Sequence, residues 1–251
     1  GFQFVEVSSS APIQLSDENL IAVEMHSDVP IIGYWSSSSD LLNKIWKATN
    51  SSYLANLFGY PTDCPQREKN GWTGDAHIAI ETGLYNFDGI SIYEKWMNDF
   101  CDEQKDNGVL PCIIPTSVWG YDWANGVDWT SAVAIIPWEI YRFYGDTTLL
   151  RRMYGPIKKY VSYIESISTN HLTDWGLGDW VPVRSKSNTT LTSSIYYYTD
   201  VCILAKAARL FGYAEDASYY NTLAQKIKEA INTSFLNKDC LLYTSDAADD
   251  L

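Results

Sequence analysis

The sequence lacks features that would place it in several large classes of protein. It has no run of roughly 18 apolar residues, the length that a membrane-spanning helix needs. It carries only 18 Lys and Arg against 31 Asp and Glu, which gives a formal net charge of −13. Nucleic acids and anionic membrane surfaces are bound through Lys and Arg that displace counterions. We therefore expect neither a nucleic acid nor a membrane as a partner.

Cysteine and histidine motifs are also missing. The five cysteines have irregular spacings and form no CxxC pair, so a zinc ribbon or a dense disulfide framework is excluded, while a single disulfide stays open. The three histidines form no HxxxH or HExxH motif, so we predict no metal and no cofactor. The chain also lacks the GxSxG motif of a serine nucleophile and the GK[ST] of a phosphate-binding loop.

Aromatic residues, by contrast, are plentiful. The chain contains 10 Trp and 18 Tyr. An indole or phenol ring offers a flat apolar face and a polar tip, a combination that suits the C–H faces and hydroxyls of a sugar. Packing between helices is the more common role for any single Trp. The composition nevertheless favours a neutral, carbohydrate-like ligand.

Residues 1–33 differ from the rest of the chain. Phe2–Val7 and Leu20–Met25 are rich in aromatic and β-branched residues, which predicts two strands. Two strands cannot bury a face alone. We expect this segment to be the end of an N-terminal β-sandwich domain whose remainder lies upstream.

From residue 34 onward the hydrophobic period becomes helical. Ser39 or Asp40 can cap a first helix, and Gly145 and Gly212 are expected to end later ones in the left-handed conformation. Further helices are predicted near Asp75–Tyr85, Ile90–Lys105, Trp129–Tyr144, Thr147–Ser168, Ser194–Phe211 and Ala214–Phe235. Repeated helical hairpins of this kind suggest an α/α toroid, for which about seven helices would be incomplete.

Three long connections separate these helices. They cover Tyr60–Gly74, Asn107–Asp128 and His171–Thr192, and together they contain Trp72, Trp119, Trp123, Trp175 and Trp180. Loops of this length in a compact domain are usually functional. We therefore expect a sugar cleft where the three loops meet.

The C-terminal residues 240–251 do not follow the helical pattern. They look like the conceptual translation of a sequencing adapter, so we predict that the natural sequence ends near residue 239. With the cut N-terminal domain, this makes the chain a fragment.

The densest polar stretch runs from Tyr60 to Asp75. It contains the carboxylates Asp63, Glu68 and Asp75. Glycoside hydrolysis needs one carboxylic acid to protonate the leaving oxygen and a second carboxylate to activate water or attack carbon. Glu68 is our candidate for the acid, because neighbouring negative charge raises a carboxyl pKa.

Two observations bear on that assignment. Arg67 and Lys69 would oppose the rise in pKa if they faced Glu68. The alternative is a surface turn of solvated charges in which Asp75 caps a helix. Trp72 and two glycines within the same stretch favour a binding site.

The segment DCPQREKNGWTGDAH, preceded by N-x3-YPT, resembles the signature of the α-L-rhamnosidases of glycoside hydrolase family 78. The resemblance extends to GFQFVEV, SSSSDLLNKIWKAT, DWTSAVAIIPWEIYRFYGD and GLGDWVP. It implies a mainly α fold, in which residues 34–239 form the N-terminal part of an (α/α)6 catalytic barrel and remnant β-sandwich strands precede it. It also implies inverting hydrolysis of terminal α-L-rhamnose residues in glycosides or polysaccharides.

The resemblance also implies a role for each matching residue. Glu68 would be the general acid, and Asp63 and Asp75 would bind rhamnose hydroxyls with Arg67 beside them. Trp72, Trp129 and Trp180 would line the apolar side of the ring, and Asp179 adjoins the last of these. Many family members carry a second acid after the arginine; this chain has Glu68 alone.

The general base of the family lies far downstream, and no residue of this chain matches it. Glu165 and Glu229 have ordinary amphipathic positions within helices, so we expect both to be solvated. The 251-residue chain should therefore be inactive and fold poorly. The alternatives are a carbohydrate-binding toroid without catalysis and another inverting glycosidase on the same barrel. The resemblance favours a periplasmic or extracellular location.

Overall fold

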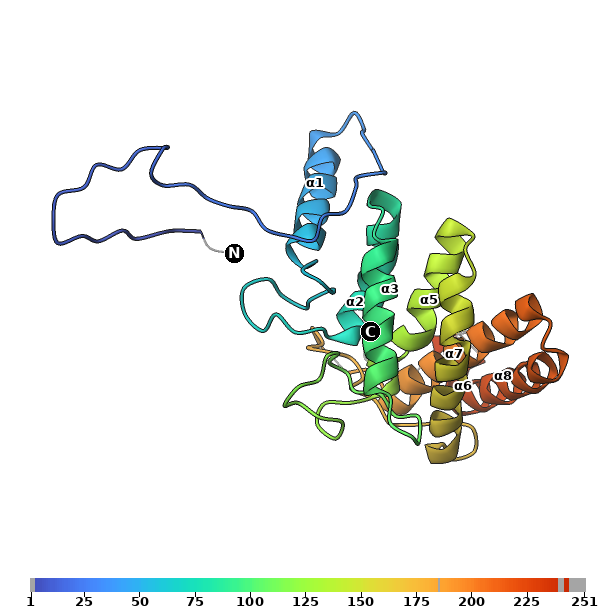
Figure 1. The fold of residues 1–251 in the computed structure, drawn as a ribbon. Helices are drawn as coiled ribbons and strands as arrows, with labels where there is room; N and C mark the ends of the chain where they lie inside the picture. Colours follow the sequence, from blue (N-terminus) through green and yellow to red (C-terminus); the bar gives the residue numbers. More distant parts are fainter. Residues whose placement is uncertain (1–2, 185, 239–241, 244–251) are drawn as a thin grey trace.

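The computed structural model describes residues 3–184, 186–238 and 242–243 (Figure 1). Its helices are α1 (Asp40–Ala55), α2 (Thr73–Asn86), α3 (Ile90–Glu103), α4 (Val127–Thr130), α5 (Ala132–Tyr144), α6 (Thr148–Ile167), α7 (Thr189–Phe211) and α8 (Ala214–Phe235). Two short strands, β1 (Leu236–Asn237) and β2 (Leu242–Tyr243), pair antiparallel. The predicted mainly α fold is confirmed.

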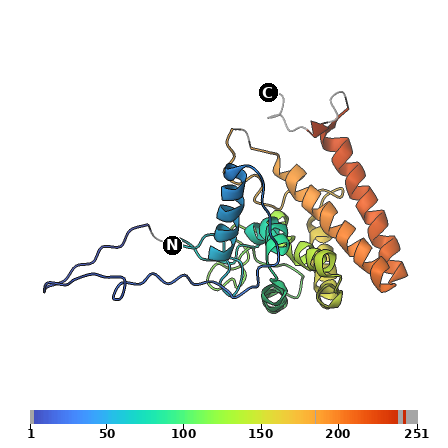
Figure 2. The same ribbon diagram turned by 90° about the horizontal axis from the view of Figure 1, so that it is seen from above.

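The long helices form an inner and an outer row. Helix α2 contacts α5, and α5 contacts α7. Helix α3 packs against both α5 and α6, and α8 packs against α7. Figures 1 and 2 show these helices following one another as successive hairpins, with α1 beside α2. This alternation is that of an α/α toroid built from hairpins. The part of the chain that the structure describes makes an arc of the toroid without closing it.

Local signals in the sequence set most helix ends. The Ser39 side chain accepts a hydrogen bond from Leu42 N and caps α1. Gly145 and Gly212 end α5 and α7 with φ values of 69° and 79°, as predicted. Asp146 accepts a hydrogen bond from Thr148 N at the start of α6. These ends confirm the expected capping and termination.

Two helix boundaries differ from the prediction. The helix expected from Trp129 to Tyr144 is split into α4 and α5 by a turn at Ser131. Helix α7 begins at Thr189 rather than Ser194. The Asn188 side chain caps it by accepting hydrogen bonds from Thr190 N and Leu191 N. The first turns of α7 are rich in Thr and Ser, so the hydrophobic period does not reveal them.

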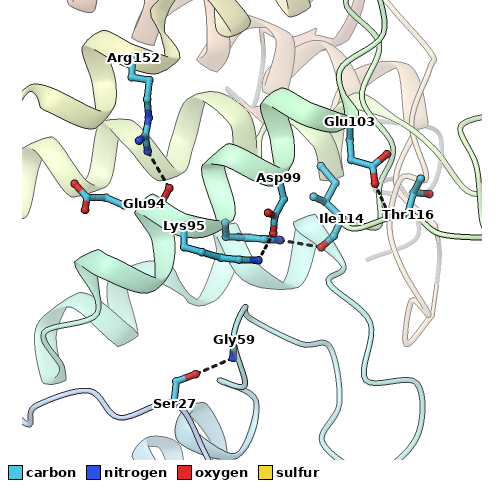
Figure 3. Close-up of polar contacts among 10 residues, drawn as sticks. Ser27, Gly59, Glu94, Lys95, Asp99, Glu103, Ile114, Thr116 and Arg152 are labelled. Carbon is cyan, nitrogen blue, oxygen red and sulfur yellow. Dashed lines mark hydrogen bonds and ion pairs between the residues drawn. The ribbon is translucent and has the colours of Figure 1, made fainter.

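Large aromatic side chains fill the space between the rows. Tyr93, Trp96, Tyr160 and Tyr197 are fully buried. Trp96 Nε1 donates to the backbone oxygen of Ile114 at 2.8 Å, which ties α3 to the following loop (Figure 3). A buried indole or phenol that lacks a partner is costly. These four residues therefore take the common role of aromatic residues in a helical core.

The prediction of two strands near the N-terminus is wrong for the described residues. Residues 3–30 form no strand, and Phe4, Ile21 and Val23 are 90%, 72% and 76% exposed. A strand needs neighbours that satisfy its backbone groups along its length, and within the described residues the backbone pairing of the segment is confined to its end, around an isolated bridge between Ile31 and Phe87. Figures 1 and 2 show it reaching away from the helices. A separate domain over residues 1–33 stays a prediction.

The end of this segment is fastened to the helical part. Ser27 N donates to Leu57 O at 2.7 Å, and Gly59 N donates to Ser27 Oγ at 2.8 Å (Figure 3). Ile32 N donates to Asn86 O at 2.9 Å. The N-terminal segment therefore joins the helical part of the chain beside the loop that follows α1.

The tail predicted to be foreign lies mostly outside the described residues. Only Leu242 and Tyr243 of residues 240–251 belong to them, and they pair with β1. The assignment of the tail stays a prediction. Among the described helices, none is long and apolar enough to cross a membrane.

Candidate active site

A cavity of about 730 Å³ opens where α1, the loop after it and the start of α2 meet the loop that precedes α7. Six of the eight predicted site residues line it: Asp63, Glu68, Trp72, Asp75, Trp129 and Trp180. They come from segments up to 117 positions apart in the sequence, counted from Asp63 to Trp180. The fold thus brings the acid-rich stretch and the aromatic residues of two other segments to one place.

A short pairing of two loops positions the acid-rich stretch. Ile114 N donates to Gly71 O at 2.9 Å, and Thr73 N donates to Cys112 O at 2.8 Å, around a bridge between Trp72 and Ile113. The bridge fixes the backbone of Trp72 immediately before α2 begins. The bridge consequently fixes the position of Trp72 relative to the first turn of α2.

Asp63 closes the loop on itself. Its Oδ1 accepts a hydrogen bond from Asn70 N at 2.9 Å, and its backbone N donates to Asn70 O at 3.1 Å. Cys64 Sγ donates to Asp63 Oδ2 at 2.7 Å and accepts from Glu68 N at 3.1 Å. The Asp63 carboxylate is thus already oriented before any ligand arrives.

Glu68 lies exposed at the rim of the cavity. Trp72 Nε1 donates to Glu68 Oε2 at 2.9 Å. One hydrogen bond from a nearly buried indole holds the carboxyl group in place while it remains open to a ligand. This is the arrangement that a positioned proton donor requires.

Asp75 occupies the third position of α2 and also lines the cavity. The pKa of this carboxyl is raised, chiefly because it is partly removed from water and further because the charges of Asp63 and Glu68 repel its own. Its own backbone N–H opposes the rise in pKa. The residue before α2 is Trp72, which makes no side-chain cap, so the alternative in which Asp75 caps the helix is not what the structure shows.

Indole rings form an apolar part of the cavity wall. Trp129 packs against Gly74, where a Cβ atom would come within 2.6 Å of the indole. Trp129 also meets Trp180 edge to face, with ring centroids 6.2 Å apart. Gly74 therefore permits the close approach that brings Trp129 into the wall.

Asp128 is not among the predicted site residues, yet it holds one of the loops that line the cavity. It is 4% exposed, and its carboxylate oxygens accept hydrogen bonds from Leu177 N at 3.0 Å and Gly178 N at 2.6 Å. Burial raises the pKa of Asp128, while the backbone N–H donors oppose that rise. Asp128 therefore holds the loop that carries Trp180, although its side chain does not line the cavity.

Helix α1 supplies a polar wall that the sequence reasoning also missed. Thr49, Ser52, Tyr53 and Asn56 line the cavity, and their spacing of three, four and seven residues places them on one helical face. Tyr53 Oη lies 2.6 Å from Tyr93 Oη. The polar stripe on α1 is visible in the sequence, but the hydrophobic period by which the helix is predicted does not mark it as part of a site.

The remaining predicted residues lie elsewhere. Arg67 is exposed and does not line the cavity. Asp179 accepts hydrogen bonds from Ser187 N and Oγ at 3.4 and 3.3 Å and is also outside the lining. Glu165 accepts from Tyr219 Oη, and Glu229 accepts from Gln225 Nε2 at 2.7 Å, both away from the cavity. In the described ranges, no three His, Cys, Asp or Glu side chains gather so as to hold a metal ion.

The geometry suits a sugar ring. Three carboxylates face a volume large enough for a monosaccharide, and three indoles supply an apolar side. Carboxylates accept hydrogen bonds from hydroxyls, and a carboxylic acid can donate a proton to a leaving oxygen. The cavity therefore combines groups that can bind a sugar with a candidate acid.

Comparison with known proteins places the chain in a family. Residues 30–251 match the family described as the bacterial alpha-L-rhamnosidase 6 hairpin glycosidase domain. A curated alpha-L-rhamnosidase of Alteromonas sp. (strain LOR) is 29% identical over 95% of this chain and 27% of its own length. One of Formosa agariphila is 29% identical over 94% and 26%. The chain thus spans about a quarter of the length of these relatives.

Solved structures of α-L-rhamnosidases contain a region with the same fold as this chain. The alpha-L-rhamnosidase of Dictyoglumus thermophilum superposes with a TM-score of 0.81 at 38% identity, over 88% of this chain and 26% of that one. That of Streptomyces avermitilis, solved in complex with L-rhamnose, gives 0.80 at 26% identity, over 85% and 21%. Together with the match over residues 30–251, these likenesses show that the chain belongs to the bacterial α-L-rhamnosidase family, within its six-hairpin glycosidase domain.

Proposed function

We propose that the cavity binds a terminal α-L-rhamnose residue of a glycoside or polysaccharide and that Glu68 protonates the leaving oxygen. The observation that carries the proposal is the Glu68 carboxyl group, held by Trp72 Nε1 at the rim of a cavity that Asp63 and Asp75 also line. Membership of the α-L-rhamnosidase family supports rhamnose as the sugar.

The other groups divide the recognition of the ring. Asp63 is fixed by Asn70 N and Cys64 Sγ, so it can accept ligand hydroxyls without prior rearrangement. Asp75 adds a second acceptor. The Trp129 and Trp180 rings offer an apolar face to the C–H side and the 6-methyl group of L-rhamnose.

We propose an inverting mechanism with a general base from outside this chain. An inverting enzyme keeps its two catalytic carboxylates about 6.5–9.5 Å apart so that a water fits between them. Glu165 and Glu229 lie away from the cavity and are bonded to Tyr219 and Gln225. The 251 residues therefore supply the acid and much of the sugar site, and the chain alone should not turn over.

Replacement of Glu68 tests the assignment. In the longer protein that we propose contains this chain, Glu68→Gln should lower kcat/KM for an aryl α-L-rhamnoside by about 10²–10⁴-fold, because the amide cannot donate the proton. Affinity for L-rhamnose should change little. Glu229→Gln replaces another exposed glutamate, one that lies in α8 outside the cavity lining, and is the matched control.

Three results would contradict parts of the proposal. Near-normal turnover by Glu68→Gln would remove Glu68 as the acid. NMR that detects α-L-rhamnose as the first-formed anomer would exclude inversion. Robust hydrolysis by the purified 251-residue chain would show that the second carboxylate is within it.

A further inference from the structure

Two exposed indoles continue the aromatic wall beyond the cavity. Trp123 lies against Trp72 with ring centroids 6.1 Å apart, and it stacks on Trp119 at 5.1 Å and an interplanar angle of 26°. Trp119 and Trp123 are 42% and 57% exposed, and neither lines the cavity. A run of three indoles thus leads from the cavity wall to the outer surface.

The loop that carries this stacked pair is firmly anchored. Glu103, at the end of α3, accepts hydrogen bonds from Thr116 N and from Tyr121 Oη, both at 3.0 Å (Figure 3 shows Glu103 and Thr116). Thr116 Oγ1 donates to Gly120 O at 3.0 Å within the same loop. The ammonium of Lys105 lies 3.9 Å from the centre of the Tyr121 ring.

The backbone conformation of this loop also favours a binding role. Ser117 and Ala124 both have a φ of 46°, in the left-handed region that residues with a Cβ rarely adopt. Strained backbone that is fastened by side chains and presents apolar surface to water is typical of binding sites. The exposed part of each indole adds nothing to the stability of the described fold.

The position of Glu68 indicates which part of a substrate would lie on the exposed rings of Trp119 and Trp123. A general acid in glycoside hydrolysis stands on the side of the leaving group, because it protonates the bridging oxygen. Glu68 is bonded to Trp72, and Trp72 contacts Trp123. The leaving group should therefore depart toward the stacked pair.

We propose that Trp123 and Trp119 form a subsite for the ring of the leaving group. The inference rests on the proposed role of Glu68. The occupant is a ring with a flat apolar face, either the C–H face of a second sugar or an aromatic aglycone, and it stacks on the exposed indole surface. Rhamnosides with such a ring next to the linkage are then preferred over those with a small alkyl group.

Equilibrium binding to the longer protein that we propose contains this chain, carrying Glu68→Gln so that the ligands are not hydrolysed, tests the subsite separately from the sugar pocket. Calorimetric titrations would use methyl α-L-rhamnoside, phenyl α-L-rhamnoside and a disaccharide of rhamnose α-linked to glucose. We expect the ring-bearing ligands to bind about 3- to 10-fold more tightly than the methyl glycoside. Tighter binding of the phenyl ligand alone would identify an aromatic aglycone as the occupant, and tighter binding of the disaccharide alone a sugar.

Variants separate stacking from general disturbance. Trp123→Ala should remove the preference and leave methyl α-L-rhamnoside affinity unchanged, while Trp123→Phe should keep most of it, because phenylalanine retains a flat ring. Trp119→Ala should reduce the preference less. Trp35→Ala removes another exposed indole, one that does not line the cavity, and is the matched control. Circular dichroism would confirm that each variant is folded.

The outcomes are distinguishable. A Glu68→Gln protein that binds all three ligands equally, or one with Trp123→Ala added that keeps the preference, would overturn the subsite and leave rhamnose recognition standing. A folded Glu68→Gln protein that does not bind methyl α-L-rhamnoside would instead contradict the proposed function.

Discussion

Asp75 and Asp128 are aspartates with raised pKa values, and they differ in what surrounds them. The Asp128 carboxylate is buried and accepts two backbone N–H groups of the loop before α7. Asp75 lies exposed at the cavity, with Asp63 and Glu68 near enough to raise its pKa further. In both cases removal from water is the largest cause of the shift in pKa.

The difference separates structure from recognition. Asp128 is buried outside the cavity lining and its carboxylate holds a loop in place, so it serves the fold. Asp75 lies near the like charges of Asp63 and Glu68, and among the described residues no cation contributes to the shift in its pKa. This arrangement destabilises the empty protein, and hydrogen bonds donated by a ligand would offset that cost. A raised carboxyl pKa does not by itself identify a site, whereas the partners of the carboxyl do.

The largest effect should follow removal of the Asp128 carboxylate. Asp128→Ala leaves Leu177 N and Gly178 N without acceptors, and we expect the free energy of unfolding to fall by about 2–4 kcal/mol. Urea denaturation followed by circular dichroism measures it. Asp179→Ala, which removes only long contacts to Ser187 from the same loop, should change stability by about 0.5 kcal/mol or less. Equal losses in both variants would break the distinction between Asp128 and its neighbours.

Much of the helical part could be predicted from sequence. Hydrophobic period and capping residues are local, and for that reason α8 has the predicted bounds and Gly145 and Gly212 end helices as expected. The strands at the N-terminus failed because a strand depends on partners elsewhere, and residue type alone does not supply them.

The candidate site shows the same limit. Asp63, Glu68, Trp72 and Asp75 lie in one stretch, so composition could find them. Asp128 acts through backbone groups some 50 positions away, and no local pattern reveals that contact. Trp129 and Trp180 reach the cavity from two further segments, and the family resemblance, rather than any spacing, predicted that they would.

An intermediate effect should follow from filling the space at Gly74. A Cβ at this position would lie 2.6 Å from the indole of Trp129, so Gly74→Ala must displace that ring or the start of α2. We expect a loss of about 1–3 kcal/mol in unfolding free energy, together with weaker binding of L-rhamnose. Gly155→Ala is the control, because a Cβ there meets no atom within 4 Å. Unchanged rhamnose affinity in a folded Gly74→Ala variant would argue against Trp129 as part of the binding wall.

The smallest effect concerns the charge of Asp75. Because its pKa is raised in the folded chain, the folded state holds this proton more tightly than the unfolded state does. The free energy of unfolding must then fall as pH rises from about 4, where an ordinary aspartate ionises, through the raised pKa. Asp75→Asn removes the ionisation, so at neutral pH the variant should be slightly more stable than the wild type, and the difference should vanish in acid.

Thermal unfolding of both proteins between pH 3 and pH 8 measures this difference, a range set roughly by the titration of aspartate. Asp75→Asn should also bind L-rhamnose more weakly, since an amide oxygen accepts a hydroxyl less strongly than a carboxylate does. Greater stability with weaker binding is the pattern of a group that is unfavourable in the empty protein and favourable with a ligand. An Asp75→Asn variant that is less stable at neutral pH would instead place Asp75 with Asp128, among the carboxylates that hold the fold.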